Sequence, residues 1–341
     1  MKAKFKYEIN LYLYIMNRAT YLMIIAVLFL TACNKDEEGY PNPAIVENIA
    51  GTYYKTLKTS DGKDREFIIY VPESAVGNQN VPVVFFIHGT GSTGQLFYDN
   101  PDLWVPKADI EGFIAVYPTA LVHCHFDNGL EKTTTKWAHG DLGENNTSLG
   151  GLPLCSNEGL AKDLEFFDMI IDLLNTDYSI DEKRIYVTGN SNGAGMGLRL
   201  AAERSDVFAA VAVNAGFQSL FIDRSITSRP MSIIITVGTN DNLFAEAIGD
   251  SVPVPINETL IHDISNFAQP VLDVHALGYN SNYTYTEALY GNKNTGEFLF
   301  DNSVMNNNNS LRFIVIDGFG HDFNPALVDV FWDFFETQSL Q

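Results

Sequence analysis

The sequence predicts an α/β fold with a mainly parallel central sheet and helices on both of its faces. Apolar runs alternate with segments of helical spacing, an order that is typical of strand–helix–strand units. Some runs are unbroken, such as VPVVFFI at 81–87, as a strand buried on both faces requires. The chain has 341 residues, of which 46% are apolar, so it is long enough to bury a large core.

The expected elements follow one another without a repeat period. Strands are expected at 66–71, 81–87, 113–117, 184–188, 208–213, 231–237 and 311–316. Helices are expected at 161–175, 194–204 and 325–337. Two stretches interrupt this order, 123–157 and 243–310. Both are predicted to be excursions over the sheet, of the kind that carries specificity.

We expect a single domain from 44 to 341, in which 243–310 is a loop excursion over the site. Segment 1–32 is predicted to be a lipoprotein signal peptide and 33–43 a tether linker. Positive residues precede an apolar run, Tyr21–Leu30, which is too short to span a membrane comfortably. Either Met1 or Met16 could be the start of the signal.

The apolar run ends in Leu-Thr-Ala-Cys at 30–33, which resembles a bacterial lipobox. Cys33 is therefore expected to become the lipidated N-terminus, and the alternative is a plain secretory signal or membrane anchor with an incidental cysteine. The acidic stretch after Lys35 is similar to the surface-export signal of Bacteroidetes lipoproteins; the alternative is a solvated linker. These features predict an extracytoplasmic, outer-membrane lipoprotein that meets the membrane only through its lipid.

Charge and cysteines narrow the classes of partner. The formal net charge is −21, which repels nucleic acid and excludes it as a partner. Cys124 and Cys155 form an even pair in an oxidising compartment, so a disulfide is expected, with two free thiols as the alternative. His123 and His125 flank Cys124, but further ligands at zinc spacing are missing. We expect neither a metal nor a cofactor.

Gly-Asn-Ser-Asn-Gly at 189–193 matches G-x-S-x-G, the sharp turn that exposes a nucleophilic serine. Composition alone can produce such a pentapeptide, so the elements on either side decide whether it is a nucleophile turn. The apolar run RIYVT enters the motif and a helix-forming segment leaves it. This is the strand–turn–helix context that the turn needs, and Ser191 is the expected nucleophile.

The loop His88-Gly89-Thr90-Gly91 follows a buried strand. Where a G-x-S-x-G serine is the nucleophile, the loop after such a strand supplies one donor of the oxyanion hole. We assign the two donors to the backbone N–H groups of Thr90 and Asn192. His88 itself is expected to support the loop rather than to react.

An acid and a base should follow the serine, each beyond a later strand. Asp241 lies just past the strand at 231–237, and Asp250 is a weaker rival further on. His321, in Asp-Gly-Phe-Gly-His after the last strand, is the expected base. Its flanking glycines allow it to reach over to Ser191 while Asp241 orients its ring.

From about Arg65 to Phe334 the chain resembles the α/β-hydrolase superfamily. More narrowly, it resembles the secreted feruloyl esterase and polyhydroxybutyrate depolymerase-like group of carbohydrate esterase family one. The matching pieces include FIIYVPES, VPVVFFIHGTGSTG, VGTNDNLF and DGFGHDF, in the family's order. That family usually has a tryptophan soon after the catalytic histidine, where this chain has Phe323. The resemblance implies an α/β-hydrolase fold and a serine esterase.

The chain has three tryptophans, of which Trp332 is expected in the core and Trp137 at the substrate, together with Phe323. The expected substrate is a polymer or oligomer that bears esters, such as feruloyl or acetyl groups on plant polysaccharide. The alternatives are a polyhydroxyalkanoate depolymerase, a peptidase and a catalytically inactive glycan-binding lipoprotein. A pure binder gains nothing from an activated serine.

Overall fold

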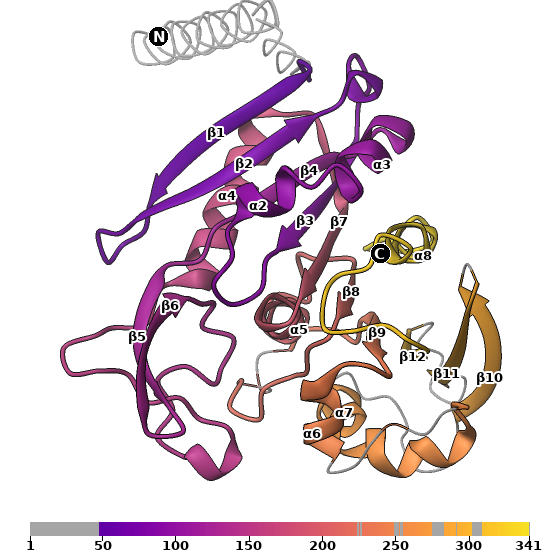
Figure 1. Ribbon diagram of the computed structural model, residues 1–341. Helices are drawn as coiled ribbons and strands as arrows, with labels where there is room; N and C mark the ends of the chain where they lie inside the picture. The colour runs from indigo at the N-terminus through magenta and orange to yellow at the C-terminus, as the bar shows by residue number, and fades with distance from the viewer. Residues whose placement is uncertain are drawn as a thin grey trace, which may run out of the picture. The chain divides into compact units, whose positions relative to one another are not determined.

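A ten-stranded sheet forms the centre of the computed structural model (Figure 1). The structure describes residues 48–340 apart from 224, 226, 249–251, 253–254, 275–282, 291 and 302–308. Contacts divide the chain into two units, Met1–Ile45 and Val46–Gln341, and the described residues all belong to the second. The predicted signal peptide and Cys33 lie outside the described residues.

The sheet is parallel in its middle and antiparallel at both edges. Its strands, in spatial order, are β1 (Gly51–Lys58), β2 (Asp64–Val71), β4 (Ile114–Pro118), β3 (Val81–Ile87), β7 (Ile180–Asn190), β8 (Ala210–Asn214), β9 (Ser232–Gly238), β12 (Ser310–Ile316), β11 (Lys293–Asp301) and β10 (Tyr283–Tyr290). From β4 to β12 all neighbours pair in parallel. The outer pairings are antiparallel. The prediction of a mainly parallel sheet is confirmed for the middle, whereas the sheet as a whole is mixed.

Helices cover both faces of this sheet. They are α2 (Gly94–Tyr98), α3 (Trp104–Glu111), α4 (Asp163–Asp177), α5 (Asn192–Glu203), α6 (Asn242–Ile248), α7 (Ile261–Val274) and α8 (Leu327–Phe335), with short 3₁₀ turns η1 (Glu73–Ala75), η2 (Thr147–Leu149) and η4 (Glu258–Leu260). One apolar core lies under α4, α5 and α7, and a second lies under α3 and α8. Strand β3 supplies both, because Phe85 faces the first core and Phe86 the second.

The segment 243–310 differs from the loop excursion that the sequence predicts. Its described part contains α6, α7 and the strands β10 and β11. Strand β11 pairs with β12 over 295–301, so this segment lengthens the sheet. Five of the eight residues of β10 are exposed and none is buried. Such an edge strand lacks the apolar run that reveals a central strand.

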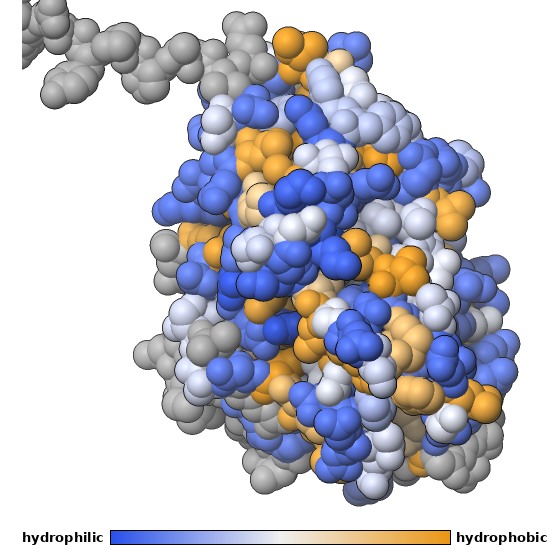
Figure 2. All heavy atoms as spheres, turned by 90° about the vertical axis from the view of Figure 1, so that its left-hand side faces the viewer, coloured by the Kyte–Doolittle hydropathy of each residue, from blue (hydrophilic) through white to orange (hydrophobic). Residues whose placement is uncertain are grey.

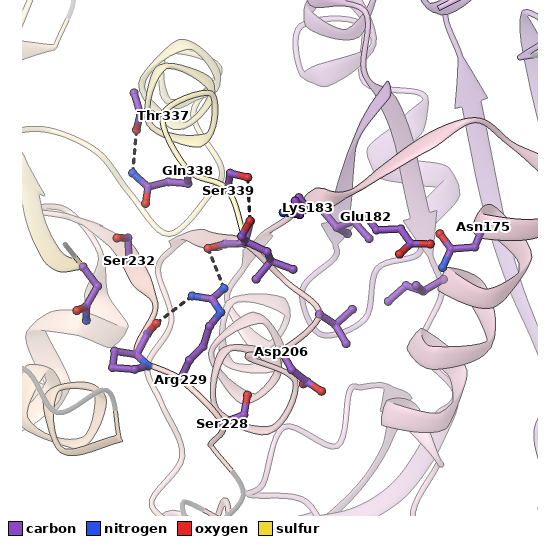
Figure 3. A pocket seen from close by; sticks show the side chains of 17 residues that line it. Asn175, Glu182, Lys183, Asp206, Ser228, Arg229, Ser232, Thr337, Gln338 and Ser339 are labelled. Atoms are coloured by element: carbon purple, nitrogen blue, oxygen red, sulfur yellow. Dashed lines mark hydrogen bonds between the residues drawn. The ribbon is translucent and has the colours of Figure 1, made fainter. Parts of the chain in front are cut away.

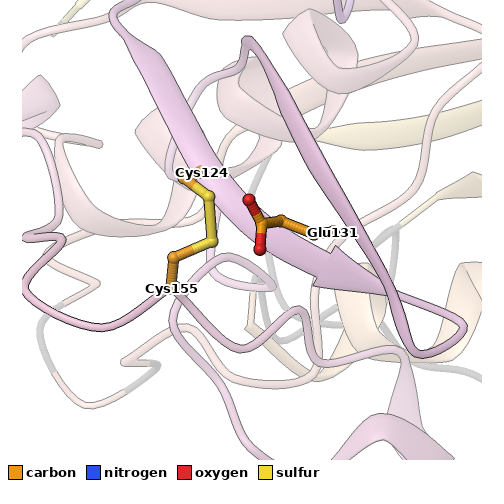
Figure 4. A group of neighbouring side chains, drawn as sticks. All are labelled: Cys124, Glu131 and Cys155. Carbon is orange, nitrogen blue, oxygen red and sulfur yellow. A yellow bond between two sulfur atoms is a disulfide. The ribbon is translucent and has the colours of Figure 1, made fainter.

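The second interruption, 123–157, contains a hairpin outside the main sheet. Strands β5 (Val122–Asp127) and β6 (Leu130–Thr135) pair with each other. A disulfide joins Cys124 of β5 to Cys155, with 5.4 Å between the Cα atoms. Glu131 lies beside the two sulfurs (Figure 4). Because the sulfurs are bonded to each other, they offer no thiolate to a metal.

Figure 2 shows the side of the molecule that lies to the left in Figure 1. Hydrophilic side chains predominate there, and hydrophobic ones form small separate patches. Within the described part of the chain, no helix has the length and apolar character needed to cross a membrane.

Candidate active site

Ser191 lies at the turn between β7 and α5, with φ 55° and ψ −120°. This left-handed backbone is strained for any residue with a side chain. The flanking glycines allow the turn. A Cβ on Gly193 would lie 2.1 Å from the Ile87 carbonyl oxygen, and a Cβ on Gly189 would lie 2.6 Å from that of Gly193. The pattern G-x-S-x-G is therefore a packing requirement in this chain.

The structure brings Ser191, His321 and Asp241 into one hydrogen-bonded row. His321 Nε2 lies 2.8 Å from Ser191 Oγ, and His321 Nδ1 lies 2.9 Å from Asp241 Oδ2. A carboxylate only accepts, so Nδ1 carries the proton and Nε2 is free to accept from the serine hydroxyl. The hydrogen bond to Asp241 raises the pKa of His321.

Both carboxylate oxygens of Asp241 accept hydrogen bonds. Its side chain is 2% exposed, and its second oxygen, Oδ1, accepts from the N–H groups of Leu243 at 2.9 Å and Phe244 at 3.3 Å. These donors belong to the first turn of α6, whose free N–H groups favour a negative charge. One oxygen therefore caps a helix while the other orients the imidazole.

The loops that carry Asp241 and His321 are locked together. The N–H of Asn240 donates to the Phe319 carbonyl at 2.8 Å. The hydroxyl of Thr239 lies 3.1 Å from Asp317 Oδ1 and accepts from the Gly318 N–H at 2.8 Å. A Cβ at Gly238 would lie 1.9 Å from the Phe319 carbonyl oxygen, so the chain can pass this close only as glycine.

The loop at 88–91 passes beside the serine. A Cβ on Gly89 would lie 3.3 Å from Ser191 Cβ. The buried His88 lies with its Nδ1 2.7 Å from the Gly89 carbonyl, and its Nε2 accepts from the Ala120 N–H at 3.0 Å. Burial lowers the pKa of His88 to about 4, so the ring stays neutral and supports the loop. Thr90 is exposed at the tip.

Asn192 begins α5, directly after Ser191. The first bond of this helix runs from the Gly195 N–H to the Ser191 carbonyl at 3.1 Å, so the N–H of Asn192 has no partner within the helix. The Asn192 side chain is bound to the backbone of Trp137. Its oxygen accepts from the Trp137 N–H at 2.7 Å, and its nitrogen donates to the Trp137 carbonyl at 3.1 Å.

Trp137 does not reach the surface, and its prediction as a substrate contact is wrong. Its side chain is fully buried, its Nε1 donates to the His88 carbonyl at 3.0 Å, and its ring lies 5.5 Å from that of Phe167. An indole whose N–H is paired gains more from burial than from exposure. Trp104 and Trp332 are buried as well. All three tryptophans are therefore core residues.

Phe323 lies two residues beyond His321 and is half-buried. Its ring packs edge-on against Phe331 of α8, with 5.9 Å between centroids. This places Phe323 beside the His321 loop, and its contact with substrate stays a prediction. Asp250, the rival acid, lies outside the described residues.

Sequence reasoning missed three polar residues beneath the site, Asn190, Asn214 and Thr236. They sit in or at the end of strands that otherwise read as apolar, and Asn214 and Thr236 are buried. A polar residue within an apolar strand is the signal that was available for Asn214 and Thr236.

A cavity of about 940 Å³ lies at the end of the sheet opposite Ser191, where the central parallel strands begin. Its lining comes from the beginnings of the central strands, as at Lys183 and Ser232, whereas Ser191 follows the end of a strand. In Figure 3, Arg229 lies in this cavity and donates to the Pro230 carbonyl at 2.9 Å. A second cavity, of about 550 Å³, is lined by residues of β10 and β11 and by Asp317. Ser191 lines neither cavity.

Curated relatives of the chain are acetylxylan esterases, although no protein-family model matches it. A bifunctional acetylxylan esterase/xylanase of Neocallimastix patriciarum is 26% identical over 186 residues, 54% of this chain and 23% of that protein. Acetylxylan esterase A of Aspergillus ficuum is 26% identical over 58% of this chain and 56% of its own length. That of Emericella nidulans is 30% identical over 44% of this chain and 41% of its own length. The chain thus spans less than two thirds of each of these relatives.

Solved structures of esterases resemble the whole domain. The acetyl xylan esterase from Aspergillus awamori superposes with a TM-score of 0.57 at 17% identity, covering 84% of this chain and 99% of that one. An S-formylglutathione hydrolase from Agrobacterium tumefaciens gives a TM-score of 0.50 at 14% identity, covering 86% and 96%. At these identities the likeness concerns the fold. The chain therefore has an α/β-hydrolase fold, and in sequence it resembles carboxylic ester hydrolases, the acetylxylan esterases.

Proposed function

We propose that this protein is a secreted serine esterase. The observation that carries the proposal is the hydrogen-bonded row Ser191–His321–Asp241, with distances of 2.8 and 2.9 Å. A nucleophile within reach of a base, with the base oriented by a third group, is the arrangement that activates a serine. The likeness to ester hydrolases supports the same conclusion.

The reaction proceeds in two acyl transfers. His321 takes the proton of Ser191 as Oγ forms a bond to the ester carbonyl carbon, and the tetrahedral adduct collapses when the protonated His321 gives its proton to the leaving alcohol. Water then attacks the acyl carbon while His321 takes its proton, and the second adduct releases the acid as the protonated His321 returns the proton to Ser191 Oγ. Asp241 stabilises the imidazolium that forms in each half.

The oxyanion is held by the backbone N–H groups of Thr90 and Asn192. Asn192 supports this role because its N–H begins α5 without a helical partner, while its side chain is tied to Trp137. Loss of one such donor typically costs about 3–4 kcal/mol of transition-state stabilisation.

The substrate that we favour is an acetyl ester on xylan or a related plant polysaccharide, because the curated relatives are named acetylxylan esterases. Feruloyl esters on the same polymers are the second candidate. A polymer cannot enter the cell, which agrees with the predicted signal peptide and with a lipid on Cys33. A polymer substrate and a lipid on Cys33 together favour an enzyme anchored at the cell surface.

The test compares the purified protein with Ser191→Ala on acetylated xylan, methyl ferulate, short polyhydroxybutyrate and p-nitrophenyl acetate. We expect acetate release from acetylated xylan by the wild type and a loss on the order of 10⁶-fold in kcat for the variant. Equal rates for the two proteins on every substrate would contradict the esterase proposal. Turnover of polyhydroxybutyrate alone would replace the polysaccharide with a polyester.

A second test concerns the anchor. Cells that express the chain are grown with a labelled fatty acid, and Cys33→Ser is the control. Label in the wild type and none in the variant is expected, whereas absence of label in both contradicts lipidation at Cys33.

A further inference from the structure

A row of three polar side chains, two of them buried, lies beneath the active site, where three central strands end. Asn190 is the last residue of β7, Asn214 is the last residue of β8, and Thr236 lies near the end of β9. The three are direct partners in the parallel register, 190 with 214 and 214 with 236. Neighbours in register point to the same face of a sheet, so their side chains meet.

These side chains form a directed chain of hydrogen bonds. The hydroxyl of Thr236 donates to Asn214 Oδ1 at 2.8 Å. Asn214 Nδ2 donates to Asn190 Oδ1 at 2.6 Å and to the Asp322 carbonyl at 3.3 Å. Asn190 Nδ2 donates to the His321 carbonyl at 3.3 Å. The row therefore ends on two consecutive carbonyls of the loop that carries His321.

Carbonyl acceptors fix the direction of this chain. Because Asp322 and His321 present carbonyl oxygens, the amide nitrogens of Asn214 and Asn190 must face them. The amide oxygen of Asn214 then needs a donor, which the hydroxyl of Thr236 supplies. Reversal of either amide would place two acceptors against each other, so only one arrangement satisfies every group.

Asn214 is hydrogen-bonded to both backbone segments that carry the reacting pair, the serine turn and the histidine loop. Its backbone carbonyl accepts from the Ser191 N–H at 3.0 Å, at the strained residue itself. Its side chain holds the backbone directly after His321. A single buried residue, 3% exposed, thus links the serine turn to the histidine loop without contact with the reacting atoms.

We propose that Asn214 is a positioning residue that sets the distance between Ser191 Oγ and His321 Nε2, with Asn190 and Thr236 fixing its orientation. The proposal rests on the proposed function, because that distance matters only if the pair reacts. Misplacement of a reacting group by about 1 Å can cost about 100-fold in rate. The bonds from the Asp241 loop hold this loop up to Phe319, and the row of amides holds it further on, at His321 and the residue after it.

A buried polar side chain in this sheet need not belong to such a row. Thr188, two residues before Asn190 on β7, is fully buried, and its hydroxyl has no hydrogen-bond partner in the structure. Thr188 therefore provides a matched control, since Thr188→Val removes a buried hydroxyl from the same sheet but no link to His321.

The first variant is Asn214→Asp, which keeps the shape of the side chain and removes both donors. The new carboxylate faces the oxygen of Asn190 and the carbonyl of Asp322. We expect kcat on p-nitrophenyl acetate to fall about 100-fold with KM nearly unchanged, because substrate binding does not involve this residue. A kcat equal to that of Thr188→Val overturns the proposal.

A second pair of variants covers the case in which Asn214→Asp fails to fold. Thr236→Val removes the donor that orients Asn214, whereas Thr236→Ser keeps the hydroxyl and loses a methyl group. We expect kcat to fall roughly tenfold in the first, about the loss of one buried hydrogen bond, and to be restored in the second. Equal loss in both variants would mean that packing alone matters and would overturn the proposal.

A readout other than catalysis separates this inference from the proposed function. The proton that His321 Nδ1 shares with Asp241 is expected to give a low-field ¹H NMR signal in the wild type and in Thr188→Val. The signal should shift or broaden in Asn214→Asp and Thr236→Val as the loop loosens. If the wild type hydrolyses no ester but the signal responds in this way, the esterase proposal fails and the positioning role stands. An unchanged signal in an active enzyme with normal kcat removes the positioning role alone.

Discussion

At the scale of single residues, the site depends on groups that are fixed from more than one side. Asp241 caps α6 with one oxygen and holds His321 with the other. Asn192 combines a backbone N–H at the helix start with a side chain tied to Trp137. Preorganisation of this kind avoids the cost of rearranging groups during the reaction.

The pH dependence follows from the His321–Asp241 contact. The imidazole must be neutral to accept the Ser191 proton, and the hydrogen bond to Asp241 raises the pKa of His321 above its usual 6.5. Activity should therefore rise with pH through that raised pKa. The same shift stabilises the fold fully below about pH 6.5, and this contribution is lost as the pH rises through the raised pKa.

Asp241→Asn should move the midpoint of the kcat/KM profile to lower pH, because the neutral amide no longer favours the imidazolium. It should also lower kcat on the order of 10⁴-fold, since an amide no longer selects the Nδ1–H tautomer. Profiles measured for wild type and variant check both effects. A midpoint that stays in place in the variant contradicts the assignment of Asp241.

At the scale of elements, the β5–β6 hairpin supports the loop that passes the serine. The Gly91 N–H donates to the Thr135 carbonyl of β6 at 2.8 Å. The hairpin in turn is joined through Cys124 to the segment at Cys155, and the N–H of Cys155 donates to the Cys124 carbonyl at 3.0 Å. The disulfide therefore stabilises a support of the predicted oxyanion hole.

Replacement of both cysteines, Cys124→Ser with Cys155→Ser, should lower the free energy of unfolding by about 3–4 kcal/mol, because the bond closes a loop with a sequence separation of 31. The value of kcat should fall as well, through the looser loop at Gly91. Chemical unfolding and ester hydrolysis measure the two effects. A reducing agent should reproduce both in the wild type and change nothing in the double variant, and a reductant-sensitive double variant would contradict this account.

The edge strands show why part of the fold escapes sequence reasoning. The central strands have apolar runs, so β3 was expected at 81–87, where it lies. Strands β1 and β10 pair on one side only, and their polar alternation gives no such run. Their place in the sheet is decided by partners far along the chain.

At the scale of the whole molecule, one buried ion pair joins three parts of the first core. Arg65 of β2 lies 2.7 Å from Asp163 of α4, and both side chains are fully buried. The second oxygen of Asp163 accepts from the Ala138 N–H at 2.8 Å. The Arg65 guanidinium also lies over the ring of Phe166, 4.2 Å from its centroid.

Arg65→Met should lower the free energy of unfolding by about 3–5 kcal/mol, because it leaves a buried carboxylate without its partner. The double variant Arg65→Met with Asp163→Leu should lose less than the sum of the single changes. Lys58→Ala is the control, since the exposed Lys58–Asp64 pair contributes about 0–1 kcal/mol. Denaturant titrations are run on the wild type, the two single variants, the double variant and the control, and an additive double variant would contradict the coupling.

The catalytic residues could be predicted because each lies in a short motif that the sequence shows directly. Ser191, Asp241 and His321 each follow a strand, and parallel strands end at one edge of the sheet, so their meeting was expected from order alone. Trp137 was assigned wrongly because its burial depends on His88 and Phe167, which are distant in sequence. Asn214 was missed because its role exists only when β8 meets the His321 loop.

The backbone of Ser191 has a consequence for the history of the protein. A serine at φ 55° stores roughly 1–3 kcal/mol that glycine in the same place would release. The fold is thus less stable than the same turn with a glycine would allow, and the proposed esterase activity is what the serine provides in return. In a relative without the proposed activity, glycine at position 191 would raise the stability of the fold with no reaction to lose.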